Sequence, residues 1–155
     1  MVQVEGIEPS RERLRVTLAR SFAAMPPVLK WLTAMGLLAL VFPVGFTFLG
    51  LRALGRPMTG LAWWSSGAGP VSTVTCLCMA ASALLMLRRT RYARTLYLLS
   101  WVALNASEPL LASMVGAAYT TWVRDLAWTA AVTAAIALFL GLSSAVGTYF
   151  KVPGN

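Results

Sequence analysis

The sequence predicts an all-α membrane protein: a polytopic chain with four transmembrane helices in an antiparallel bundle, preceded by an amphipathic helix. Three observations support this fold class. The 155 residues are 58% hydrophobic and only 12% charged, whereas a soluble domain carries about 25% charged residues. Four long stretches, 31–51, 57–87, 95–123 and 126–150, hold one charge between them, and a spanning helix needs about 20 mostly apolar residues. Their apolar runs are continuous rather than alternating, which favours helices over strands.

Residues 1–27 are expected to form a cytoplasmic segment that contains an amphipathic helix lying on the membrane surface. Pro9 and Ser10 are typical of a helix start. On a helical wheel one face is apolar, formed by Leu14, Leu18, Phe22 and Met25. Basic side chains project elsewhere and are predicted to meet anionic lipid headgroups: Arg13, Arg15 and Arg20. The alternative is a partly disordered basic tail.

The transmembrane domain is expected over 28–150, with its first span at 28–51 and its second at 71–87. Pro43 should kink the first span because proline lacks a backbone donor. The uncharged stretch 57–87 is too long for one span. Its first part, 57–70, contains glycines and the pair Trp63 and Trp64, so we expect an outer loop with an aromatic anchor at the lipid interface.

The third span is expected at 93–117 and the fourth at 122–149, joined by a short connection as an antiparallel hairpin. Residues 151–155 form the tail. Ten Lys and Arg residues flank one set of span ends, while Arg52, Arg56 and Arg124 flank the other. Cytoplasmic loops carry the excess of basic residues. The sequence therefore predicts a multi-pass membrane protein with both termini in the cytoplasm.

Composition excludes most site chemistry. The chain has no histidine, the commonest general base and metal ligand. Cys76 and Cys78 are two positions apart, so on a helix they point in different directions and cannot share a metal or a disulfide. No base stands at a motif spacing from a Ser or Thr. We expect no catalytic, cofactor-binding or metal-binding residue. The basic residues that give the net charge of +8 lie at the ends of the predicted spans, so this charge indicates topology rather than nucleic-acid binding.

Glu108 is the one acidic residue deep in a predicted span, and a carboxylate in hydrocarbon is costly. Asn105, three residues earlier, shares its helix face, and Pro109 can open the helix there. Asn105, Glu108 and Arg124 are therefore the candidate intramembrane polar site. Glu108 could form a structural pair with Arg124 or Arg52, bind a proton or substrate, or lie shallow in water.

Small residues recur every four positions near the end of the fourth span, at Ala137, Gly141 and Ala145. Such stripes let helices approach closely. They could serve packing within this bundle, or a contact with a second copy or another subunit. The pattern alone does not choose between these.

Two segments carry a resemblance to a known family. Trp31-Leu32 is followed by Gly36-Leu37 and Pro43, and the other end contains Ser143, Val146 and Phe150. These resemble the first span and the closing Ser-x-x-Val-x-x-x-Phe of a family of small four-span bacterial inner-membrane proteins of unknown function. Lys30 replaces that family's small residue before the Trp, and Ser144, Ala145 and Gly147 stand where it usually has basic residues. The resemblance implies four helices and no known activity.

The expected function is non-enzymatic: a small integral membrane protein that acts as a subunit or accessory partner of a membrane complex. Its expected partners are the lipid bilayer and other membrane subunits or a second copy of itself, with no nucleic acid and no cofactor. Two alternatives remain. One is a small proton-coupled transporter or channel that uses Glu108. The other is an immunity-type protein that intercepts a pore-forming toxin.

Overall fold

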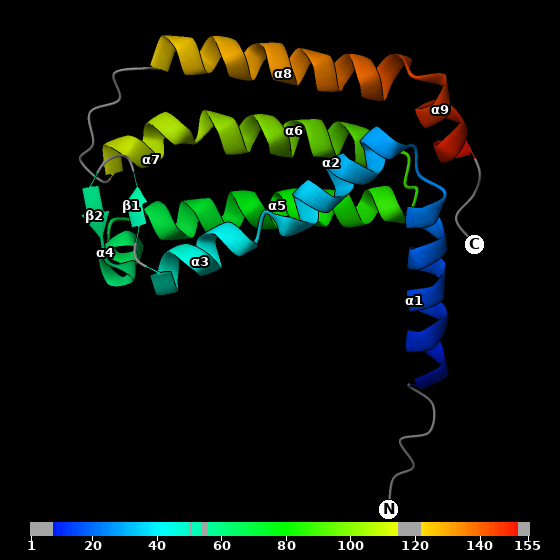
Figure 1. Cartoon of the computed structure of the whole chain (residues 1–155), viewed down its shortest axis with the longest axis horizontal. Coiled ribbons are helices and arrows are strands. Elements are labelled where there is room, and N and C mark those ends of the chain that lie inside the picture. The colour runs from blue at the N-terminus through cyan, green and yellow to red at the C-terminus, as the bar shows by residue number, and fades with distance from the viewer. Residues whose placement is uncertain (1–7, 50, 54–55, 115–121, 152–155) are drawn as a thin grey trace, which may run out of the picture.

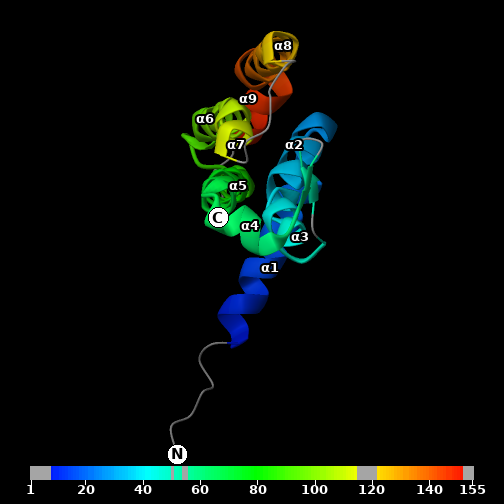
Figure 2. The same cartoon turned by 90° about the vertical axis from the view of Figure 1, so that its left-hand side faces the viewer.

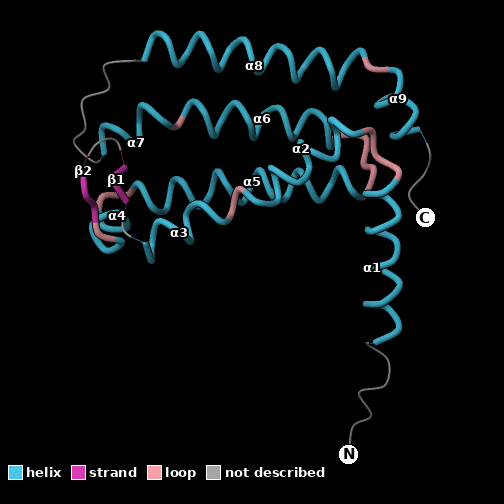
Figure 3. Tube along the Cα trace, viewed as in Figure 1, coloured by secondary structure: helices cyan, strands magenta, loops and turns pink. Residues whose placement is uncertain are grey.

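The computed structural model describes residues 8–49, 51–53, 56–114 and 122–151, and these are almost entirely helical (Figures 1 and 3). The helices are α1 (Glu8–Ala23), α2 (Pro27–Leu38), α3 (Val41–Leu49), α4 (Gly60–Ser65), α5 (Ala68–Leu87), α6 (Ala93–Ala106), α7 (Glu108–Met114), α8 (Trp122–Leu142) and α9 (Ser144–Lys151). A short antiparallel hairpin of β1 (Leu51–Ala53) and β2 (Arg56–Met58) links α3 to α4.

The long helices are stacked rather than closed into a bundle. In Figures 1 and 2, α5, α6 and α8 lie one above the other and alternate in direction, with α2 and α3 beside α5. Helix α5 packs against both α2 and α6, while α8 packs on α6 and on α9. Helix α1 points away from one end of this stack (Figure 1). The helical fold class is confirmed, and the antiparallel bundle of four spans stays a prediction.

The core lies where α2, α5 and α6 meet. Leu29, Ala83, Met86 and Tyr97 are all fully buried there. A Cβ on Gly36 of α2 would lie 2.9 Å from the Ala83 Cβ, so glycine lets these two helices approach closely. The Tyr97 hydroxyl donates to the Leu32 carbonyl at 2.8 Å, which satisfies a buried hydroxyl and ties α6 to α2.

The helix of the first predicted span is interrupted, and the position of the break follows from Pro43. The helix is interrupted at Ala39 and Leu40, between α2 and α3. The carbonyl of Ala39 would accept from the backbone N–H of residue 43, which proline lacks. It accepts instead from Phe42, at 3.3 Å.

Two described segments are long and apolar enough to cross a membrane, Pro27–Leu49 and Ala68–Leu87, with a third if a bent pair counts as one span. That pair is Leu126–Leu142 and Ser144–Lys151, which meet at 56°. The bend corrects the prediction of one continuous helix over 122–149. It falls at Ser143 and Ser144, and serine and glycine pairs are common sites of sharp kinks.

The third predicted span, 93–117, is divided into α6 and α7 at Ser107, and residues 115–117 lie outside the described residues. Pro109 accounts for the break, because the Asn105 carbonyl one turn earlier loses its usual donor. The Ser107 N–H closes the end of α6 by donating to the carbonyls of Ala103 and Asn105.

The expected outer loop 57–70 is also more ordered than predicted. It contains β2 and α4, and α5 already begins at Ala68. Gly67 precedes α5 with φ +85, a left-handed conformation that glycine adopts without strain. The Thr59 hydroxyl caps α4 by accepting from the Ala62 N–H at 3.3 Å.

Candidate functional site

A hydrogen-bonded group on α6 faces α8 and organises the candidate site. The Trp101 indole Nε1 donates to the Thr133 hydroxyl of α8 at 3.1 Å. One turn later on α6, the Asn105 amide donates to the Trp101 carbonyl at 2.8 Å. The Asn105 side chain is therefore held on α6 next to the hydrogen bond that joins α6 to α8. Asn105 belongs to the polar site predicted from the sequence.

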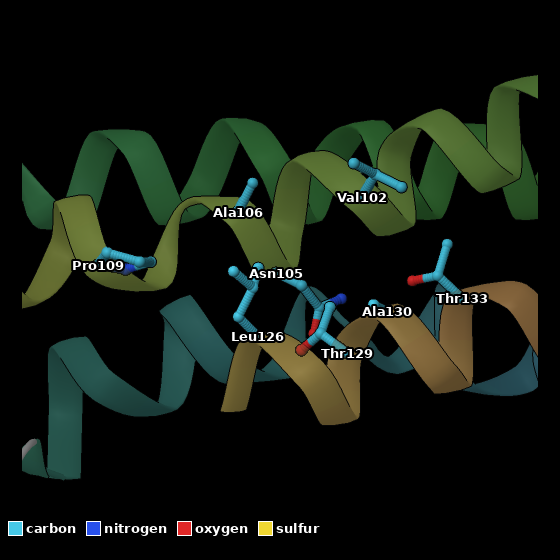
Figure 4. A pocket seen from close by; sticks show the side chains of 8 residues that line it. All are labelled: Val102, Asn105, Ala106, Pro109, Leu126, Thr129, Ala130 and Thr133. Carbon is cyan, nitrogen blue, oxygen red and sulfur yellow. The ribbon is translucent and has the colours of Figure 1, made fainter. Parts of the chain in front are cut away.

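Next to this group, α6 and α7 diverge from α8 and leave a cleft of about 490 Å³ (Figure 4). Its lining comes from α6, α7 and the first half of α8: Val102, Asn105, Ala106, Pro109, Leu126, Thr129, Ala130 and Thr133. Figure 4 shows Asn105, Leu126 and Thr129 gathered where the two helices face each other. Val102 and Leu126 are 45% and 60% exposed, so the cleft opens on the outer surface of the stack.

The chemistry of the cleft is hydrogen bonding within an apolar surround. Its polar residues are Asn105, Thr129 and Thr133. Ala106 and Ala130 line its sides with small side chains. None of the lining groups is ionisable. Among the described residues, no three His, Cys, Asp or Glu side chains gather in a way that could hold a metal ion.

A second cavity, of about 320 Å³, lies on the other side of α6, toward α3 and α5. Glu108 lines it, together with Ser72, Cys76 and Trp101. Asn105 lines both cavities, so its side chain stands between them.

The structure brings together only two residues of the candidate intramembrane polar site. Glu108 is exposed at the start of α7 and shares the second cavity with Asn105. Arg124 is exposed in the first turn of α8 and lines neither cavity. The expected pairing of Glu108 with Arg124 stays a prediction.

The predicted lipid-interface residues have different positions. Arg20 is exposed in the last turn of α1, whereas Arg13 and Arg15 belong to α1 but their side chains lie outside the described residues. Trp64 is 40% exposed and donates to the Thr47 hydroxyl at 2.9 Å. Trp63 corrects the prediction: it is only 4% exposed, because α4 folds back on α3 and directs this indole inward.

Trp63 instead packs edge-on against Phe46, with ring centroids 5.6 Å apart. Its Nε1 is buried without a partner in the part of the chain that the structure describes. This tryptophan therefore anchors α4 to α3 rather than to lipid.

Among the described residues, the predicted small-residue stripe is mostly exposed rather than packed against another helix. Gly141 is exposed, and a Cβ built on it would meet no atom within 4 Å. Ala145 is exposed on α9, beyond the bend, while Ala137 is half-buried on α8. The close approach of helices is at Gly36, which sequence reasoning missed because a single glycine has no distinguishing pattern.

Trp101 and Thr133 were also missed. An indole and a hydroxyl 32 positions apart give no spacing signal, and only the packing of α8 on α6 brings them together. No family model, no curated protein and no solved structure matches this chain. The resemblance of its two ends to small four-span inner-membrane proteins therefore stays a prediction.

Proposed function

We propose that this chain is a non-enzymatic, four-span protein of a bacterial inner membrane that serves as a subunit of a larger membrane complex. The observation that carries the proposal is the cleft between α6 and α8, which presents Asn105, Thr129 and Thr133 on the outer surface of an otherwise apolar stack. The occupant that we infer is a transmembrane helix of the partner subunit, with a hydrogen-bonding side chain directed into the cleft.

The physical argument is the cost of polar groups in hydrocarbon. Lipid tails offer no hydrogen bonds, so amides and hydroxyls that face lipid gain from a protein partner. Ala106 and Ala130 at the sides of the cleft add little bulk, and small residues let two helix backbones approach closely. A lipid acyl chain would fill the volume and leave Asn105 without a further partner, so a polar helix face suits the cleft better.

The exposed side of α8 supports the same proposal. Trp128, Leu138 and Leu142 are 72%, 60% and 79% exposed, and Gly141 has open space beside it. Among the described elements, α8 has its main contacts with α6 and α9 only. This helix therefore offers a large surface to a neighbouring subunit.

The four-span arrangement counts the three apolar segments as spans and treats α6 and α7 together as one further span. The two helices follow one another along the stack in Figure 1, despite the break at Ser107. Four spans return the chain to its starting side, which agrees with α1 and α9 lying at the same end of the stack. The basic connection between α5 and α6 lies at that end too, so we propose that it faces the cytoplasm.

Purification from the native membrane in mild detergent tests the subunit proposal, with two matched variants. Ala130→Phe fills the cleft, while Ala131→Phe adds the same ring at an equally exposed neighbour that does not line it. We expect the wild type and Ala131→Phe to retain a membrane protein in fixed stoichiometry, and Ala130→Phe to lose it. A wild-type chain that purifies as a lone monomer, or equal retention by both variants, contradicts the proposal.

Proton-coupled transport is a second candidate, favoured by the position of Glu108. This carboxylate lines the second cavity with Ser72, and Asn105 stands between that cavity and the cleft. A titratable group that lines a cavity within an apolar helix stack is the arrangement that a proton-linked carrier needs. Proton flux in proteoliposomes that is lost in Glu108→Gln and kept in Glu108→Asp supports transport. Equal flux with empty liposomes excludes it.

A further inference from the structure

The end of the stack that carries α1 and α9 collects most of the basic side chains. Four arginines lie in or next to the connection between α5 and α6: Arg88, Arg89, Arg91 and Arg94. Further cations come from the neighbouring elements α1, α2 and α9 at the same end (Figure 1): Arg20, Lys30 and Lys151. Two of the acidic residues in the described helices, Glu108 and Asp125, lie in the first turns of α7 and α8, at the opposite end of the stack (Figure 1). The other two, Glu8 and Glu12, lie in the first half of α1, which points away from the stack.

Arg89 has a backbone conformation that a non-glycine residue rarely adopts, with φ 54. It closes α5 in a Schellman motif, since the Thr90 N–H donates to the Leu85 carbonyl at 3.2 Å and the Arg89 N–H to the Met86 carbonyl at 3.1 Å. Glycine is the usual residue at this position. Strained positions of this kind are commonly retained for what the side chain does.

The Arg89 side chain extends over a ring of α9. Its guanidinium carbon lies 4.5 Å from the centre of the Tyr149 ring, and the Tyr149 hydroxyl donates to the Met86 carbonyl at 3.2 Å. The Arg89 Nε is buried without a partner among the described residues. Arg89 thus adds a positive charge to this end that no described carboxylate offsets.

Arg94 fixes the other side of α9. Its Nη1 donates to the Leu140 carbonyl at 3.0 Å, near the C-terminal end of α8 where a cation is favourable. Its guanidinium also lies 5.3 Å from the centre of the Phe150 ring. Arg89 and Arg94 therefore hold α9 across the end of the stack.

Arg88 and Arg91 remain directed outward, and both are exposed. The Arg91 guanidinium lies 4.4 Å from the ring centre of Tyr92, which is itself 57% exposed. Tyrosine rings are enriched at the level of lipid headgroups. An exposed tyrosine beside exposed arginines is therefore the combination expected of a surface that contacts lipid headgroups. The guanidinium groups can donate hydrogen bonds to phosphate oxygens.

We propose that this end binds the headgroup phosphate of an anionic phospholipid, with Arg88 and Arg91 as the contacting residues, while Arg89 and Arg94 hold α9 across the end beside them. Charge complementarity favours a phosphate-bearing lipid, because seven cations gather at this end, whereas the acidic residues on its elements are Glu8 and Glu12 of α1. The proposal requires a membrane location but no partner subunit, so loss of the partner in the cleft experiment would leave it standing.

The test is the selectivity of the purified protein for phosphatidylglycerol over phosphatidylcholine. Each lipid is titrated into the protein in an uncharged detergent, and the apparent affinity is read from the rise in unfolding temperature. A basic residue near an anionic lipid surface contributes about fivefold in affinity, so removing two gives roughly a 25-fold loss. We expect this loss for phosphatidylglycerol in the double variant Arg88→Gln and Arg91→Gln, and no change for phosphatidylcholine.

Two controls make the result specific to this end. Arg124→Gln removes an exposed cation from the opposite end of the stack and should keep the selectivity. Replacing Arg88 and Arg91 by Lys keeps the charge and should keep most of the selectivity. If the double Gln variant is poorly folded, added salt must abolish the preference in the wild type, since exposed charges are screened. Equal affinity of the wild type for both lipids, unchanged selectivity in the double Gln variant, or a preference that persists at high salt overturns the proposal.

Discussion

The indole Nε1 of Trp101 donates to the hydroxyl of Thr133 at 3.1 Å, and this bond joins α6 to α8 beside the cleft. At the other end of the same helix pair, Arg94 donates to the Leu140 carbonyl. The two bonds hold α8 to α6 at two points, and α8 diverges beyond Trp101 toward its first turn. The cleft lies between the first half of α8 and the neighbouring part of α6, with Thr133 in its lining.

The Trp101–Thr133 bond should contribute measurably to stability. We expect Trp101→Phe and Thr133→Val each to destabilise the protein, with a coupling free energy of about 0.6 kcal/mol in a double-mutant cycle, typical of hydrogen bonds between membrane helices. Reversible unfolding in mixed micelles measures it. Strictly additive effects of the two substitutions would show that the bond does not couple α6 to α8.

Gly36 should tolerate no side chain. We expect Gly36→Ala to cost about 1–3 kcal/mol through overpacking, because the added Cβ would lie 2.9 Å from the Ala83 Cβ and 3.1 Å from a Tyr97 ring carbon. Gly141→Ala is the matched control, since its Cβ meets nothing within 4 Å. It should leave the unfolding free energy unchanged or slightly raised. Equal effects at both glycines would contradict the close approach of α2 to α5.

Arg89 allows the cost of its backbone conformation to be measured separately from its side chain. Arg89→Gly and Arg89→Ala both remove the guanidinium from Tyr149, but only glycine adopts φ 54 without strain. We expect the glycine variant to be more stable than the alanine variant by about 1 kcal/mol. Thermal unfolding of the two variants in the same detergent gives the difference. A more stable alanine variant would mean that α5 ends differently.

The four-span proposal predicts a defined pattern of reporter activity. We expect fusions truncated after Tyr92 and after Lys151 to give cytoplasmic fluorescence with a green fluorescent protein reporter. A fusion after Thr59, which follows one span, should instead activate an alkaline phosphatase reporter in the periplasm. Periplasmic activity at Lys151 would indicate an odd number of spans, and α6 with α7 would then not cross the membrane.

Several local features could be predicted from the sequence because they depend on one residue type. Pro43 and Pro109 interrupt their helices as expected, since a missing backbone donor acts on the carbonyl one turn away regardless of the surroundings. Asn105 and Glu108 could be selected because polar groups within apolar runs are conspicuous. Their partners could not: Asn105 bonds the Trp101 carbonyl, and the predicted Arg124 lines neither cavity.

The positions of the tryptophans show where this reasoning fails. Trp63 and Trp64 are adjacent and identical in type, and both were expected at the lipid interface. The structure buries one against Phe46 and leaves the other at the surface, because α4 turns back on α3. Which side of a short helix faces inward depends on the element that it packs against, and no property of the pair itself contains that information.

By itself, the sequence determined that this chain is helical, that its helices are apolar enough to cross a membrane, and that its basic residues gather near particular helix ends. These properties are sums over neighbouring residues, so composition and local order suffice to specify them. Only the tertiary structure decided that α8 packs on α6 through Trp101 and Thr133, that a cleft opens beside Asn105, and that Arg89 and Arg94 hold α9 across one end. Those features depend on contacts between residues tens of positions apart, whose energies are set by shape and distance rather than by hydropathy.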